Sequence, residues 1–236
     1  MKLAIEEMGS GSRTVALVHG ASAAGDIWRE FARVLIDNYD VRVLLVDQRG
    51  HGASARAETY AFEDFSGDLI DTLPEELDLL IGQSLGALSS MLAAVTLRPR
   101  RLILLDPPLE ASLVMRLLLG YVAPVQKRLP EWVIRKLLPA GAAPDLPRRL
   151  HGIWRSWDSR MMPQLARQRG RTPHRVEPPP VPATIVLADP SSFVSAPLAG
   201  RLRAAGWDVR VKPGGVHDLH VQDPAGVVDL LADVLS

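Results

Sequence analysis

The sequence contains no cysteine among its 236 residues. That absence excludes disulfides, thiolate catalysis and cysteine-based zinc sites, and it fits a reducing compartment. No apolar run reaches the roughly 18 residues of a membrane span. Residues 1–13 carry acidic side chains where a signal peptide would have its apolar stretch. The default expectation is therefore a cytoplasmic protein that does not enter a membrane.

Other features of function-bearing sequences are also missing. The chain has no glycine-rich phosphate loop and no cluster of metal-ligating residues, so neither a cofactor nor a metal is implied. Its isoelectric point is about 7.0, and no basic and aromatic surface motif is present, which argues against a nucleic-acid partner. With 47% apolar and 23% charged residues, the composition is that of an ordinary globular protein.

The zero net charge hides an uneven distribution. Residues 109–182 carry 13 Lys and Arg against 5 Asp and Glu, a charge of +8, together with 11 of the 19 prolines. This shift predicts a helical lid inserted at 109–182 into a core made of 1–108 and 183–236, with lid helices over 113–119, 132–138 and 146–157. Two readings of the charge stay open, namely a solvated helix surface or recruitment of an anionic or carrier-bound acyl substrate.

Outside that segment, β-rich apolar runs alternate with helical patterns. Strands are expected at 14–19, 41–46, 77–81, 101–105, 183–187 and 208–212, and helices at 26–37, 62–73, 85–97, 196–205 and 224–235. Near-continuous Val, Leu and Ile in the strands indicate an α/β protein with a mostly parallel sheet covered by helices on both faces. Ligands bind beyond the carboxyl ends of such strands, so functional residues are expected just after them.

The run Gly82-Gln83-Ser84-Leu85-Gly86 follows a predicted strand and opens a predicted helix. This context is typical of a nucleophile elbow, in which a sharp turn exposes a strained serine at the helix N-terminus. The competing interpretation is a glycine-rich turn with a capping serine. We favour Ser84 as a nucleophile.

Two other strand ends carry polar turns. Gly20 follows the first strand and can aim the backbone N–H of Ala21 into the site, where it would pair with the N–H of Leu85 as an oxyanion hole. His19 is expected to order that loop. The turn after the second strand is expected to be a structural one, rigidified by an internal pair between Asp47 and Arg49, without a catalytic role.

The loop after the last strand reads Gly214-Gly215-Val216-His217-Asp218-Leu219-His220. A histidine there can reach the serine and act as general base. His217 directly follows the glycine turn and is the preferred candidate, whereas His220 is expected to pack or to hydrogen-bond the loop. The order serine, acid, histidine is that of one hydrolase architecture.

Four stretches, VALVHGAS, LLVDQRGHGAS, LLIGQSLGA and GGVHDLHVQDP, occur in order from Val15 to Pro224. Together they resemble the α/β-hydrolase fold superfamily, in particular its small esterase and lactonase-like members with a helical lid. The resemblance implies a cofactor-free serine hydrolase that acts on a small-molecule ester, thioester or lactone. It leaves open a non-hydrolytic enzyme (lyase, C–C hydrolase, cyclase or cofactor-free haloperoxidase) and a ligand-binding protein that turns over slowly.

The third triad member departs from the family's pattern. The family's acid usually lies a few residues beyond the strand at 183–187, where this chain has Ser191, with Asp189 two residues early. Some relatives take the acid from the preceding strand end, which here provides Asp106. We favour Asp106 and keep Asp189 as the alternative, while Asp218 is expected to point the wrong way for this role.

Overall fold

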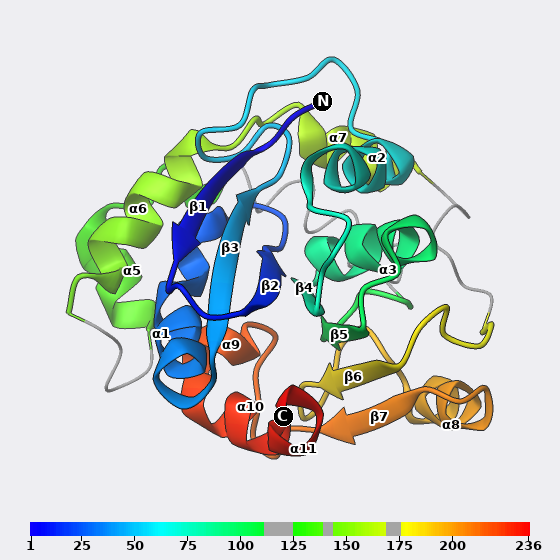
Figure 1. The fold of residues 1–236 in the computed structure, drawn as a ribbon. Coiled ribbons are helices and arrows are strands. Elements are labelled where there is room, and N and C mark those ends of the chain that lie inside the picture. Colours follow the sequence, from blue (N-terminus) through cyan, green and yellow to red (C-terminus); the bar gives the residue numbers. More distant parts are fainter. Residues whose placement is uncertain (111–124, 139–143, 169–175) are drawn as a thin grey trace.

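A computed structural model describes residues 1–110, 125–138, 144–168 and 176–236 of the chain. Its centre is a seven-stranded sheet with the order β1-β3-β2-β4-β5-β6-β7 (Figure 1). The strands are β1 (Ala4–Met8), β2 (Arg13–Val18), β3 (Val41–Asp47), β4 (Leu79–Gln83), β5 (Arg101–Leu105), β6 (Ala183–Leu187) and β7 (Asp208–Val211). Strand β1 runs antiparallel to β3, and all other neighbours are parallel. The predicted α/β class and mostly parallel sheet are thus confirmed.

Successive strand residues contribute to two different cores. In β2, Ala16 and Val18 pack into one hydrophobic cluster, whereas Val15 and Leu17 pack into the other. This division follows from the alternation of side chains across a pleated sheet. Helices α2 (Phe62–Thr72), α3 (Leu85–Leu97) and α8 (Ala196–Ala204) cover the first face, and α1 (Arg29–Asn38) and α10 (Pro224–Leu230) cover the second (Figure 1).

Two predicted helices differ in detail from those observed. The helix expected at 26–37 begins with a 3₁₀ turn, η1 (Gly25–Trp28), before α1, and the helix expected at 224–235 is divided into α10 and α11 (Ala232–Leu235). A short helix, α9 (Leu219–Gln222), precedes α10. Among the described residues, no helix has the length and apolar character needed to cross a bilayer.

The segment between β5 and β6 contains α5 (Glu131–Leu137), α6 (Leu146–Ser156) and α7 (Met161–Arg167). Ile134 and Leu150 join the core on the α1 face, whereas Met161 and Trp157 join the core on the α2 face. The described helices therefore pack against both halves of the molecule. The expected helix at 113–119 lies outside the described residues.

The prediction of an Asp47–Arg49 pair is wrong. Arg49, which is 8% exposed, pairs instead with Asp68 of α2 at 2.6 Å. Asp47 accepts the backbone N–H groups of Gly25 and Ala53. Backbone N–H groups already satisfy the Asp47 carboxylate, so Arg49 pairs with α2 instead. Both side chains still rigidify the turn.

Candidate active site

Ser84 is the single residue between the end of β4 and the start of α3. Its backbone has φ 52° and ψ −117°, a left-handed conformation that is strained for any residue but glycine. The turn is tight enough that a Cβ at Gly86 would overlap the Val18 carbonyl oxygen, and one at Gly82 would overlap the backbone of Gly86. The glycines two before and two after Ser84 thus permit the elbow geometry that the sequence indicates.

His217 and Asp106 form a hydrogen-bonded pair. The Nδ1 atom of His217 lies 2.7 Å from Oδ2 of Asp106, which directly follows β5 and is 1% exposed. The other carboxylate oxygen of Asp106 accepts the Ser191 hydroxyl at 2.7 Å and the Ala188 N–H at 3.3 Å. The aspartate is therefore fixed on both sides and its negative charge is directed at the imidazole.

Ser191 is a site residue to which the sequence reasoning gave no role. It occupies the usual acid position of the family and hydrogen-bonds the carboxylate that lies at the neighbouring strand end. Asp189, the alternative acid, is exposed and faces the N–H of Gly214 at 3.4 Å. It makes no hydrogen bond to His217, so the geometry pairs the histidine with Asp106 and leaves Asp189 aside.

The amide of Gln83 occupies the opposite side of the His217 ring. Its Nε2 lies 3.2 Å from Nε2 of His217 and donates to the His217 carbonyl oxygen at 3.1 Å and to Oδ1 of Asp218 at 3.3 Å. When the Nδ1–H of His217 donates its hydrogen bond to Asp106, Nε2 of His217 is an acceptor, like the two oxygens. Ser84 and His217 form no hydrogen bond with each other in this structure. Nε2 of His217, the atom that would accept the serine proton, instead contacts the Gln83 amide.

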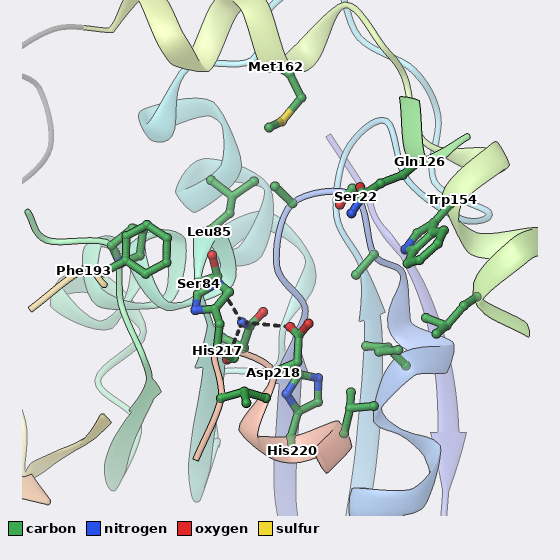
Figure 2. A pocket seen from close by; sticks show the side chains of 18 of the residues that line it. Ser22, Ser84, Leu85, Gln126, Trp154, Met162, Phe193, His217, Asp218 and His220 are labelled. Atoms are coloured by element: carbon green, nitrogen blue, oxygen red, sulfur yellow. Dashed lines mark hydrogen bonds between the residues drawn. The ribbon is translucent and has the colours of Figure 1, made fainter. Parts of the chain in front are cut away.

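A cavity of about 670 Å³ opens above Ser84 (Figure 2). Ser84 and His217 line it together with Ala21 and Leu85, the two residues expected to supply oxyanion N–H groups. Most of the remaining lining is apolar, and α5, α6 and α7 contribute to it through Ile134, Trp154 and Met162, respectively. The predicted nucleophile, base and oxyanion residues thus meet at one cavity.

Three histidines near the site are buried. Burial lowers the pKa of His19 to about 4 and the pKa values of His51 and His220 to about 3. His19 accepts the Gln48 N–H at Nε2 and, as expected, orders its loop. His220 packs on Trp28 with ring centroids 3.9 Å apart, and neither of its ring nitrogens has a hydrogen-bond partner.

These histidines predict a loss of stability in mild acid. Their folded-state pKa values lie below the unfolded value of about 6.5, so the unfolded chain binds more protons as the pH falls from there towards 4. The free energy of unfolding should fall by about 1 kcal/mol per pH unit for each histidine over that window. Urea unfolding at pH 7 and pH 5 measures it, and His51→Gln should flatten the dependence. Equal stability at the two pH values would contradict this expectation.

The profile of the Alpha/beta hydrolase family matches residues 15–230, so the chain belongs to the α/β-hydrolase family. A putative non-heme chloroperoxidase of Synechocystis is 38% identical over 86 residues, which cover 34% of this chain and 30% of that protein. A pimeloyl-[acyl-carrier protein] methyl ester esterase of Methylococcus capsulatus is 35% identical over 94 residues, 40% of this chain and 35% of that one. The chain thus matches about a third of the length of these curated relatives.

Among solved structures, E-2-(acetamidomethylene)succinate hydrolase superposes with a TM-score of 0.77 at 22% identity. The match covers 98% of this chain and 94% of that one. At this identity the likeness shows the shared fold, and the chemistry must be argued from the residues of the site.

Proposed function

We propose that the protein is a serine hydrolase that cleaves a carboxylic ester, thioester or lactone at Ser84. The observation that carries the proposal is the 2.7 Å pair of His217 and Asp106 beside a serine held at φ 52° on the wall of an apolar cavity. This set of groups suits nucleophilic catalysis. The match to a protein named as a methyl ester esterase adds support for ester chemistry.

In the proposed reaction the Ser84 hydroxyl attacks the carbonyl carbon while Nε2 of His217 takes its proton. Asp106 accepts the Nδ1–H bond and stabilises the imidazolium that forms. His217 then returns the proton to the leaving oxygen or sulfur, which leaves an acyl-enzyme, and water completes the hydrolysis by the same route. Before the first step, Nε2 of His217 must exchange its contact with Gln83 for one with Ser84.

The proposed oxyanion hole consists of the N–H groups of Ala21 and Leu85. Both residues line the cavity, and Leu85 is the first residue of α3, where the N–H groups of the first turn have no partner within the helix. The helix dipole also favours negative charge at this end. Each such donor contributes about 3 kcal/mol to the stabilisation of a tetrahedral intermediate.

We further propose that residues 109–182 form a lid on a core of 1–108 and 183–236. The support is that α5, α6 and α7 all contribute side chains to the cavity that contains Ser84. A lid of this kind would select substrates by the shape of its apolar inner surface.

One observation favours a second candidate, a ligand-binding protein that turns over slowly. The Gln83 amide occupies Nε2 of His217, and Ser84 makes no hydrogen bond to that ring. If the arrangement persisted with ligand bound, the serine would lack its base. A petunia protein named karrikin insensitive 2 receptor is 31% identical over 101 residues, 39% of this chain and 36% of that one.

A fluorophosphonate probe combined with p-nitrophenyl butanoate separates the two candidates. A serine hydrolase should be labelled at Ser84, as located by peptide mass spectrometry, and should release p-nitrophenol over many turnovers. A binding protein should release at most about one equivalent. Labelling at a different residue, or no multiple turnover, would contradict the proposed hydrolase function.

A further inference from the structure

The cavity contains a carboxylate that the proposed triad does not use. The side chain of Asp218 faces the cavity beside His217 (Figure 2). Its Oδ1 accepts a hydrogen bond from the Gln83 amide at 3.3 Å, and Asp218 forms no ion pair with any described residue. A carboxylate offers about four acceptor positions, so most of the hydrogen-bonding capacity of Asp218 is unused.

Structural roles for Asp218 find little support. It is the residue before α9, yet its side chain accepts no N–H from that helix. It does not hold Nδ1 of His217, because Asp106 does. The protein packed around Asp218 raises its pKa, but the residue is exposed, so a ligand in the cavity can reach it. An accessible carboxylate with no structural use is a candidate for binding.

His220 is a second, independent indication that the cavity binds a polar ligand. It is 2% exposed, it lines the same cavity from α9, and neither ring nitrogen is hydrogen-bonded. Figure 2 shows it on the same side of the cavity as Asp218. The neutral imidazole offers one acceptor and one donor nitrogen. Two polar side chains with unused hydrogen-bonding capacity, two residues apart, therefore face one largely apolar cavity.

The charged residues that line the cavity indicate the sign of the charge that a ligand would carry. Among the described residues that line the cavity there is no Lys or Arg, and Asp218 is the single carboxylate. A low-dielectric wall that carries one negative group attracts cations and repels anions. Residues 109–182 are rich in Lys and Arg, but none of these basic side chains lines the part of the cavity that the structure describes.

We propose that Asp218, assisted by His220, binds a protonated amine of the substrate, so that the protein prefers amine-bearing esters to esters that carry a carboxylate. The inference rests on the proposed hydrolase function, because it concerns selectivity at the same cavity. The amine N–H groups would donate to the Asp218 carboxylate and to the acceptor nitrogen of His220, which gives His220 a partner and uses acceptor positions of Asp218 that Gln83 leaves free.

Three p-nitrophenyl esters of equal chain length test the preference: the hexanoate, the 6-aminohexanoate and the adipate monoester. At pH 7 the wild-type kcat/KM for the amine ester should exceed that for the carboxylate ester by roughly 10- to 100-fold, the range expected for a charged hydrogen bond. Asp218→Asn should lower the ratio of amine ester to hexanoate by about tenfold. The matched control is Asp229→Asn at an exposed position of α10, which should leave that ratio as in the wild type.

A binding measurement separates this inference from the proposed function. Calorimetry with hexylammonium and hexanoate needs no turnover, and the wild type should bind the ammonium at least tenfold more tightly. If the esters were inert but the ammonium bound in an Asp218-dependent way, the hydrolase function would fail and the amine site would stand. Equal or faster cleavage of the carboxylate ester, or equal binding of the two ions, would overturn the amine site even if Asp218→Asn failed to fold.

Discussion

Replacing Ser84 with alanine should lower the turnover of p-nitrophenyl esters on the order of 10⁶-fold, because loss of the nucleophile disables a triad that acts as a unit. The reason lies in the elbow. Ser84 lies between β4 and α3 with a φ of 52°, and this turn places it on the cavity wall. The measurement is the initial rate with purified protein, with circular dichroism to check that the variant is folded.

Ser22→Ala is the matched control for that variant. Ser22 lines the same cavity and also has a positive φ, 59°, so its replacement reproduces both the loss of a hydroxyl group and the backbone setting. Its effect should stay below about tenfold, because no step of the proposed reaction uses its hydroxyl. More than a few per cent of residual activity in Ser84→Ala would show that another residue is the nucleophile.

The second large effect is expected for Asp106→Asn, which should lower turnover about 10⁴-fold, as the equivalent change does in a well-studied triad protease. Asparagine keeps the size of the side chain, but its NH₂ group can face Nδ1 of His217 and favour the wrong tautomer. Asp189→Asn should have little effect, because Asp189 is exposed and its carboxylate faces the N–H of Gly214. Comparing the rates of the two variants decides between the two acids. The reverse ranking would move the triad acid to Asp189.

The parallel part of the fold could be predicted because its strands are buried on both faces. Residues such as Val15 to Val18 are all fully buried, which gives an uninterrupted apolar run in the sequence. Strand β1, with the sequence AIEEM, was missed because it lies at the sheet edge and none of its residues is buried. Helix α7 was also missed, since Pro163 in its first turn reads as a helix breaker in a sequence but is tolerated there.

The candidate site could be predicted where a local motif positions its residue, and not where distant segments meet. Ser84 lies in a five-residue pattern whose strand and helix the structure contains. The choice between Asp106 and Asp189 depends on which carboxylate reaches His217 in the folded chain. Asp106 lies more than 100 positions before that histidine, and no spacing rule in the sequence indicates that the two side chains meet. The same holds for Gln83, whose contacts with His217 and Asp218 bridge 134 and 135 positions of the chain.

The way in which the chain leaves and re-enters the sheet has a further consequence. Strands β5 and β6 are adjacent and parallel, so the intervening segment leaves at the carboxyl end of β5 and returns at the amino end of β6. Both ends are fixed by the sheet: the N–H of Asp106 donates to the carbonyl oxygen of Val186 at 2.8 Å, and the N–H of Leu102 donates to that of Pro182 at 3.0 Å. Closing a longer loop adds only about 0.6 kcal/mol of entropy cost for each doubling of its length. We therefore expect that the segment between β5 and β6, the proposed lid, can be exchanged for one of another length or polarity that spans the same two ends, while Ser84 and the Asp106–His217 pair keep their supports in the sheet.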